Sequence, residues 1–244
     1  MSPAGRGVHT RILWLDVAES SLDVAQLDGS GMICRGRSGS MATLAWAGMT
    51  HIGKVRATNE DQFLAAPPVF LVADGMGGHE CGDVASALVT DAFLPLAGRH
   101  EIEIDAVERA VLDANASVRR AAAHSATEHA MGTTLVALLL VAGTVPDRWV
   151  AVNVGDSRLY RLSAGVLEQI TTDHSLVEEL VSTGSITRAE ARRHPDRNVV
   201  TRAMGISDGV VADYAFLELR EGDRFLLCSD GVHGELADEQ IRVL

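Results

Sequence analysis

The stretch Val69-Phe-Leu-Val-Ala-Asp-Gly-Met-Gly-Gly-His79 joins an apolar run, expected to form a buried strand, to a glycine-rich turn that carries Asp74. Two other stretches repeat this arrangement, because Asp156 follows the apolar run 149–154 and Asp230 follows the run 224–228. Glycine beside each carboxylate permits a sharp turn and leaves room for a bound group. Carboxylates gathered at strand ends are costly unless a cation neutralises them, and such hard oxygen ligands suit Mg²⁺ or Mn²⁺. The sequence therefore predicts a metal-dependent enzyme.

An ordinary turn is the alternative interpretation of each aspartate, because Asp-Gly is a standard turn pair. Three such turns, each directly after an apolar strand, favour a shared site. Spacing by itself does not decide between the two.

Composition narrows the choice of partners and compartment. The chain has 244 residues, 47% of them hydrophobic, which is enough for one main core. Its 33 acidic residues outnumber 21 basic ones, so we expect neither nucleic acid nor an anionic membrane as partner. No apolar stretch approaches the roughly 20 residues that span a bilayer, and no secretory signal is visible. Three scattered cysteines without a CxxC pair indicate a reducing compartment, so we expect a cytoplasmic protein. We also expect a monomer.

Two regions differ in composition. Residues 1–40 are rich in Gly, Ser and Arg and are expected to form a poorly structured extension, with apolar residues for one short element within 11–27. Residues 41–244 are expected to form one domain. Its strands are predicted at 69–73, 133–141, 149–154, 159–162, 211–217 and 225–228, and its main helices at 82–96 and 105–124. Two short helices are predicted at 175–183 and 187–193, the second with a Thr187–Glu190 capping box. This order indicates an α+β fold of two antiparallel sheets with helices outside.

A second polar cluster, Arg56-Ala-Thr-Asn-Glu-Asp61, precedes the first aspartate. An arginine near an acidic metal site can grip a phosphate through two parallel hydrogen bonds. The alternative is an ion pair of Arg56 with Glu60 or Asp61, which is common on protein surfaces.

Seven short motifs occur in the order that bacterial PP2C-type (PPM) serine/threonine phosphatases show, and the chain resembles that family from about Thr43 onward. The motifs are Arg56-x-x-Asn59-Glu60-Asp61, Val72-Ala-Asp-Gly-Met-Gly-Gly-His79, Gly82-Asp-Val-Ala-Ser86, Met131-Gly-Thr-Thr134, Val154-Gly-Asp-Ser-Arg158, Thr172-Asp-His-Ser-Leu176 and Leu227-Cys-Ser-Asp-Gly231.

The resemblance implies a four-layer αββα sandwich, two antiparallel sheets flanked by helix pairs. It also implies two Mn²⁺ or Mg²⁺ ions, and possible room for a third. Asp74 would bridge the two ions, with the Gly75 carbonyl and Asp230 as further ligands. Asp156 would share the third ion with Asp230, Glu60 would hold a metal-bound water, and Asp61 would support this network. Arg56 resembles the arginine that binds substrate phosphate.

The activity implied by the resemblance is hydrolysis of phosphoserine and phosphothreonine by a water that two metal ions activate. Partners would be phosphorylated proteins, either Ser/Thr kinases or their substrates. No covalent phosphoenzyme is needed, so no cysteine should matter to turnover. Met76 stands where animal members carry a histidine that is the usual candidate acid. For His79 we expect loop packing, and for His174 a place beside a helix N-terminus.

Residues 183–204 match a flap segment of bacterial members and carry a basic run in an acidic chain, Arg188, Arg192, Arg193, Arg197 and Arg202. Two interpretations stay open. The arginines form a solvated face, or they meet acidic flanks of phosphopeptide substrates.

The pattern departs from the family after Asp230. A complete member continues past the position of Leu244 to a Gly-x-x-Asp-Asn segment whose aspartate binds the second metal. The sandwich is therefore expected to be incomplete at the C-terminus, as in a truncated chain. The alternative is a catalytically impaired PP2C-like module that binds phosphorylated partner proteins. A hydrolase of small phosphomonoesters is a third possibility.

Overall fold

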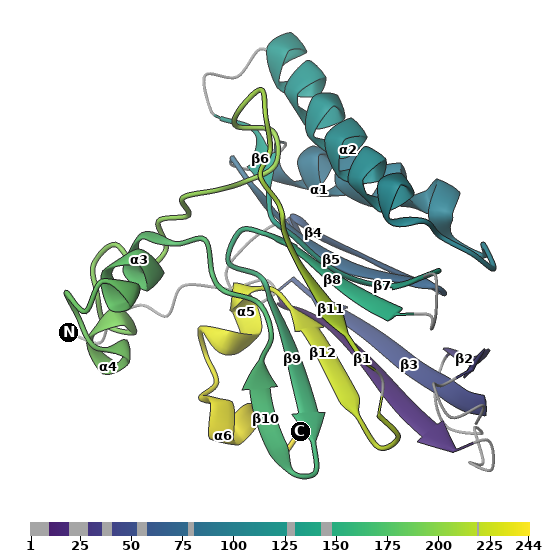
Figure 1. The fold of residues 1–244 in the computed structure, drawn as a ribbon. Coiled ribbons are helices and arrows are strands. Elements are labelled where there is room, and N and C mark those ends of the chain that lie inside the picture. Colours follow the sequence, from purple (N-terminus) through teal and green to yellow (C-terminus); the bar gives the residue numbers. More distant parts are fainter. Residues whose placement is uncertain are drawn as a thin grey trace.

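Two antiparallel sheets face each other in the computed structural model, which describes residues 10–19, 29–35, 41–52, 58–77, 81–125, 130–142, 148–218 and 220–244. The first sheet has the strand order β11-β8-β7-β5-β4, with β6 paired to the end of β5. The second has the order β10-β9-β12-β1-β3-β2. Figure 1 shows the two sheets as stacked layers.

Strands of the first sheet are β4 (Asp61–Ala66), β5 (Val69–Met76), β6 (Gly132–Thr133), β7 (Leu135–Val141), β8 (Arg148–Val154) and β11 (Asp213–Leu217). Those of the second are β1 (Thr10–Glu19), β2 (Gly29–Arg35), β3 (Met41–His51), β9 (Arg158–Ser163), β10 (Val166–Gln169) and β12 (Arg224–Cys228). Most strands predicted from residue 41 onward are therefore confirmed.

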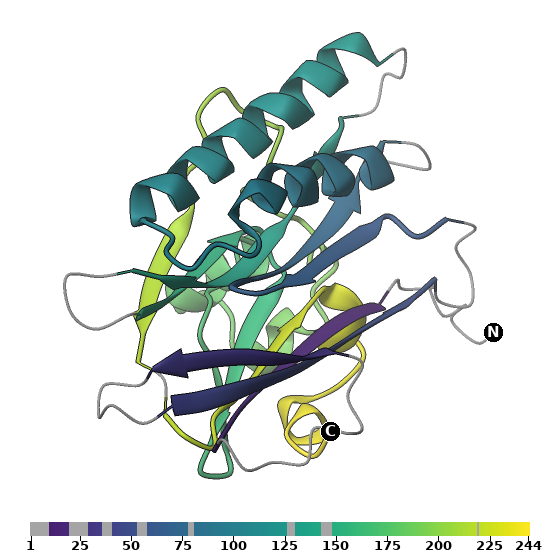
Figure 2. The same ribbon diagram turned by 90° about the vertical axis from the view of Figure 1, so that its right-hand side faces the viewer.

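Two helices cover the outer face of the first sheet (Figure 2): α1 (Gly82–Phe93), continued by the 3₁₀ turn η1 (Leu94–Leu96), and α2 (Ile104–His124). The α2 side chains at three- and four-residue spacing face the sheet, as predicted: Val107, Ala110, Val111, Ala114 and Val118. The second sheet has a smaller helical cover, made in the described chain by α5 (Asp230–His233) and α6 (Asp238–Ile241). The α+β class and the two antiparallel sheets are confirmed.

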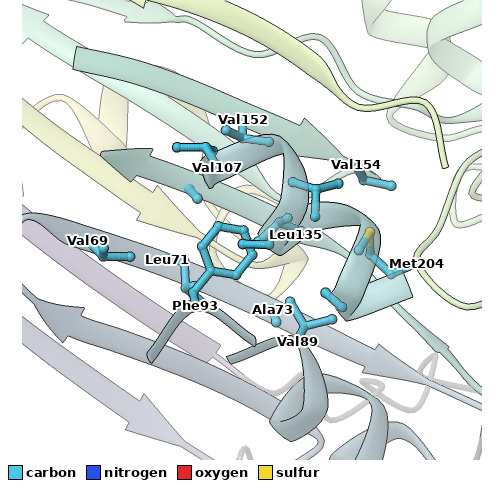
Figure 3. Close-up of a cluster of buried hydrophobic side chains, with 14 of the residues drawn as sticks. Val69, Leu71, Ala73, Val89, Phe93, Val107, Leu135, Val152, Val154 and Met204 are labelled. Atoms are coloured by element: carbon cyan, nitrogen blue, oxygen red, sulfur yellow. The ribbon is translucent and has the colours of Figure 1, made fainter. Parts of the chain in front are cut away.

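Alternation along β5 separates the two main cores. Val69, Leu71 and Ala73 belong to the cluster between the first sheet and its helices, part of which Figure 3 shows. Phe70 and Val72 belong to the cluster between the two sheets. Because successive side chains of a strand point to opposite faces, Asp74 continues the face that looks toward the second sheet.

The N-terminal part of the chain differs from its prediction. The one short element expected within residues 11–27 is β1, residues 10–19, whereas the expectation of a poorly structured segment is wrong for residues 29–35, which form β2; residues 1–9, 20–28 and 36–40 lie outside the described residues. Strand β1 pairs with β3 on one side and with β12 on the other. Its alternating Leu13, Leu15 and Val17 are buried between the sheets. The alternation of apolar residues in this short run therefore predicts the strand better than the Gly-, Ser- and Arg-rich composition of the residues around it.

The two short helices predicted near the flap are α3 (Leu176–Ser182) and α4 (Arg188–Ala191). Both begin with a side-chain cap, Ser175 for α3 and Thr187 for α4, and the Thr187–Glu190 capping box is present. His174 therefore directly precedes an N-cap, as expected. Of the helices that the structure describes, none has the length and apolar composition needed to cross a bilayer.

Candidate active site

The three aspartates lie at one end of the sandwich because each lies at or just beyond the end of a core strand. Asp74 lies near the end of β5, Asp156 lies in the turn between β8 and β9, and Asp230 begins α5 directly after β12. Their charges interact, since Asp230 and Asp156 both raise the pKa of Asp74. The structure thus brings together three of the residues that the sequence singled out.

Burial is the main reason why the pKa of Asp74 lies well above the usual value of an aspartate, and the neighbouring charges of Asp61, Asp230 and Asp156 add to it. Asp61 stands directly opposite Asp74 on the neighbouring strand β4 and also hydrogen-bonds with it. Such a group of carboxylates resists full ionisation unless positive charge enters among them.

The pKa of Asp156 is also raised by burial and by neighbouring charges, but less than that of Asp74. Burial, then the charges of Asp230 and Asp173, raise its pKa to about 7, while Arg158 acts in the opposite direction. Its backbone carbonyl accepts a hydrogen bond from His233 Nε2 at 3.0 Å. Burial lowers the pKa of His233 well below its usual value, so this imidazole is neutral and serves as a donor. Sequence reasoning missed His233, which has no spacing that would mark it.

Thr133 and Thr134 hold the backbone of Asp74 on both sides. The Asp74 amide donates to Thr134 Oγ1 at 2.9 Å, and the Asp74 carbonyl accepts from the Thr134 amide and from Thr133 Oγ1, each at 2.9 Å. Thr134 Oγ1 also lies 2.7 Å from Ser157 Oγ, next to Asp156. The Met131-Gly-Thr-Thr134 motif therefore fixes one aspartate and links it to the turn of another.

Glycine at position 75 is required by close packing. A Cβ atom there would lie 2.0 Å from the Gly82 carbonyl oxygen and 2.5 Å from the Glu60 carbonyl oxygen. The same Glu60 oxygen accepts hydrogen bonds from the Gly75 amide at 3.1 Å and from Ser86 Oγ at 2.6 Å. This contact seats the N-terminus of α1 against the turn after Asp74 and keeps Glu60 beside it.

Asp61 is fully buried, and its Oδ2 accepts a hydrogen bond from Ser229 Oγ at 2.8 Å. Ser229 immediately precedes Asp230, so this bond joins the start of β4 to the end of β12. The resemblance implies a supporting role for Asp61 in the metal site, which stays a prediction.

His174 ties the flap to the turn that carries Asp156. Its buried Nδ1 accepts from the Gly155 amide at 3.1 Å, and its Nε2 lies 3.1 Å from Asp213 Oδ2. Its carbonyl accepts from the Thr201 amide at 2.8 Å on the return side of the flap. Gly155 has φ +110°, a conformation that favours glycine. His174 is thus an anchor between two segments.

The remaining residues singled out from the sequence contribute no contact to this cluster that the structure describes. Arg56 and His79 lie outside the described residues, so their positions stay predictions. Met76 ends β5, half-buried. Cys228 is buried, which raises the pKa of its thiol to about 12 and makes it a poor nucleophile.

The donor set suits a hydrated divalent cation. Within the described ranges, no three His, Cys, Asp or Glu side chains form a ready-made metal site. Mg²⁺ and similar ions, however, keep several waters and take only one or two carboxylates, together with backbone carbonyls. Asp74, the adjacent Gly75 carbonyl and Asp230 carry donor oxygens of this kind, and a cation would offset the burial and mutual repulsion that raise the pKa values of Asp74 and Asp156. These residues therefore fit Mn²⁺ or Mg²⁺.

Comparison with known proteins agrees with the geometry. The family model described as Protein phosphatase 2C matches residues 47–243. The serine/threonine phosphatase stp of Listeria innocua is 38% identical over 195 residues, which cover 75% of each chain. The serine/threonine protein phosphatase PstP of Mycobacterium tuberculosis is 39% identical over 203 residues, 81% of this chain but only 38% of the length of that relative.

Solved structures give the same result. The crystal structure of Mycobacterium tuberculosis PstP superposes with a TM-score of 0.72 at 33% identity, over 95% of this chain and 84% of that one. The catalytic domain of PstP in complex with two manganese ions superposes over the same shares with a TM-score of 0.70 at 32% identity. Since the family model covers most of the chain, and the acidic turns that it spans converge at one end of the sandwich, this chain belongs to the protein phosphatase 2C family.

Proposed function

We propose that this chain is a metal-dependent protein serine/threonine phosphatase. The observation that carries the proposal is the convergence of Asp74, Asp156 and Asp230, whose mutual charge calls for bound cations. The printed names of its relatives, which are serine/threonine phosphatases, support the same activity. They give no support to a module that binds without catalysis.

Each acidic residue has a proposed role. Asp74, the Gly75 carbonyl and Asp230 would hold two ions. Asp156 and Asp230 would hold a third ion, and Glu60 would position a metal-bound water. When bound, the cations supply a water of lowered pKa and stabilise the charge that develops on the phosphoryl group. Mn²⁺ is the ion held by the related PstP catalytic domain, and Mg²⁺ has the same ligand preference.

The chain itself contributes orientation. Thr133 and Thr134 keep the Asp74 backbone from turning, and Ser229 holds Asp61 behind it. Arg56 is proposed to grip the phosphate oxygens through paired N–H donors. A cavity of about 380 Å³ opens on Asp156 and Asp230 and gives a phosphorylated side chain room to approach.

The proposed partners are phosphorylated kinases or their substrates. We propose that this chain acts on them as a monomer in the cytoplasm. The absence of a CxxC pair and the acidic composition support this setting, because a net charge of −12 disfavours nucleic acid and anionic membranes.

The direct test is phosphate release from a phosphothreonine peptide with Mn²⁺ present. We expect release that stops when a chelator is added and resumes when Mn²⁺ is restored. Release that is indifferent to chelator, or no release from a folded protein, would contradict the proposal.

Replacing Arg56 with alanine tests the phosphate-gripping role. We expect KM for the phosphopeptide to rise about tenfold, the scale of one charge-assisted pair, while Mn²⁺ affinity stays unchanged. Steady-state kinetics and a calorimetric Mn²⁺ titration measure the two. Arg99→Ala, at an exposed arginine after η1, is the control. A loss of Mn²⁺ affinity in Arg56→Ala would instead indicate that Arg56 pairs with the acidic cluster.

The stabilising effect of Mn²⁺ should depend on pH. The pKa values of Asp74 and Asp156 are raised on folding, so in metal-free protein these groups favour the folded state at low pH. This contribution is lost as pH rises, for Asp156 between about 4 and about 7. Mn²⁺ competes with these protons and should therefore raise Tm more at pH 8 than at pH 5. At 100 times Kd the increase at pH 8 should be about 5–10 °C.

Scanning calorimetry at both pH values, with and without Mn²⁺, measures this difference. Asp156→Asn should reduce it, whereas Glu221→Gln, at an exposed position, should leave it unchanged. An equal Tm increase at the two pH values would show that these carboxylates do not take up the ion.

A further inference from the structure

The cavity beside the candidate active site is lined by side chains of both charges. Its lining includes Asp156 and Asp230 together with Arg188 of α4 and Arg192 and Arg197, which follow α4. Figure 1 places α3 and α4 near α5, at the end of the sandwich where the aspartates gather. Basic side chains therefore line the same cavity of about 380 Å³ as two of the proposed metal ligands.

Ion pairing distinguishes the cations that line this cavity. Arg158 is held by Asp173 through three hydrogen bonds, and Arg188 by Glu178 through two of 2.9 and 3.0 Å. Both are neutralised by the protein itself. They are therefore poor candidates for binding an external anion.

Of the arginines that line the cavity, Arg192 and Arg197 remain available to bind an external anion. Arg192 approaches Asp238 only to 3.7 Å, with side chains 54% and 53% exposed, and such a loose surface pair contributes little. For Arg197, no acidic partner exists among the residues that the structure describes. The Asn198 amide lies beside them in the same wall.

We propose that Arg192 and Arg197 form a second anion-binding subsite, which selects phosphopeptides carrying another negative group near the phosphorylated residue. This inference rests on the proposed phosphatase function, because it requires the scissile phosphate to lie beside Asp156 and Asp230 in the same cavity. A sphere of the cavity's volume is about 9 Å across, and an extended peptide advances about 3.3–3.6 Å per residue. The second group is therefore expected within two or three residues of the phosphothreonine.

The chemistry of the subsite is shared by two kinds of group, a carboxylate and a second phosphate. Arginine binds both in a bidentate manner. Of the five arginines in the flap, the structure thus assigns this role to two. Arg202 is paired with Asp213 at 3.0 Å, and Arg193 does not line the cavity.

The test compares three phosphothreonine peptides that differ only at the second and third residues on each side. One carries alanine there, one glutamate, and one a single phosphoserine. With Mn²⁺ at low ionic strength, kcat/KM for the glutamate and phosphoserine peptides should exceed that for the alanine peptide about 3- to 10-fold. The advantage should reside mainly in KM and should shrink as salt screens the charges. Whichever charged peptide gains more identifies the natural anion.

Variants locate the effect. Arg192→Ala combined with Arg197→Ala should abolish the advantage and leave hydrolysis of the alanine peptide close to wild type. Arg193→Ala, which removes the same charge from the same segment outside the cavity, should preserve it. Equal kcat/KM for all three peptides, or an advantage that survives in the double variant, would overturn the proposal.

The alanine peptide allows the proposed function and the proposed subsite to be tested independently. Its hydrolysis tests the phosphatase, and the ratio between peptides tests the subsite. If no peptide is hydrolysed, the same ratio is measured as Kd by fluorescence anisotropy of labelled peptides. A ratio of one then overturns the subsite, and a ratio of 3 to 10 that the double variant abolishes supports it.

Discussion

Asp74→Asn is expected to lower metal-dependent phosphate release at least about 10²–10³-fold, the scale of losing one preorganised electrostatic element of an active site. Asparagine has the same shape, and the bonds to Thr133 and Thr134 involve only the backbone, so the turn should keep its position. What changes is the negative charge among Asp61, Asp156 and Asp230. Phosphate release from a phosphothreonine peptide at saturating Mn²⁺ measures the loss.

Stability should move in the opposite direction from activity in this variant. Removing one of several repelling buried carboxylates relieves the metal-free protein at neutral pH, so its Tm should equal or exceed that of the wild type. A calorimetric scan at pH 8 without metal checks this. Asp113→Asn, an exposed position on α2, is the matched control and should change neither quantity. Wild-type turnover in Asp74→Asn would remove Asp74 from the active site.

Leu15→Asp is expected to prevent folding. Leu15 is fully buried in β1, opposite Trp46 of β3 and Phe225 of β12, within the cluster between the sheets. An unpaired carboxylate there costs several kcal/mol, comparable with the total stability of about 5–15 kcal/mol for a typical domain. Near-UV circular dichroism and a urea titration should show no cooperative transition.

A matched control exists in the same sheet. Val166 of β10 is 67% exposed, so Val166→Asp makes the same kind of change without burying the charge. This variant should unfold cooperatively with a midpoint close to wild type. A Leu15→Asp protein that unfolds like Val166→Asp would mean that β1 does not belong to the core.

The sequence predicted those parts of the fold that depend on local pattern. Alternating or continuous apolar runs marked β5, β7, β8 and β12, and three- to four-residue spacing marked α2. The aspartates of the candidate site were visible because each follows such a strand. The place of β1 between β12 and β3 was not, because strand pairing between distant segments leaves no local pattern.

Contacts inside the site were equally hidden. Thr133 and Thr134 stood in a recognised motif, but only the paired strands show that they hold the Asp74 backbone. The flap arginines looked alike as a basic run. Their difference arises from partners elsewhere: Glu178 for Arg188 and Asp213 for Arg202.

The position of β1 also affects biosynthesis. Asp16 of β1 and Arg224 of β12 form an ion pair although they are 208 positions apart. At a translation rate of about 5–20 residues per second, the nascent strand waits about 10–40 s for that neighbour to leave the ribosome. During this interval its apolar side chains are open to chaperones or to unwanted association. Slow translation or a missing chaperone should therefore lower the yield of soluble protein, without changing the stability of the molecules that have folded.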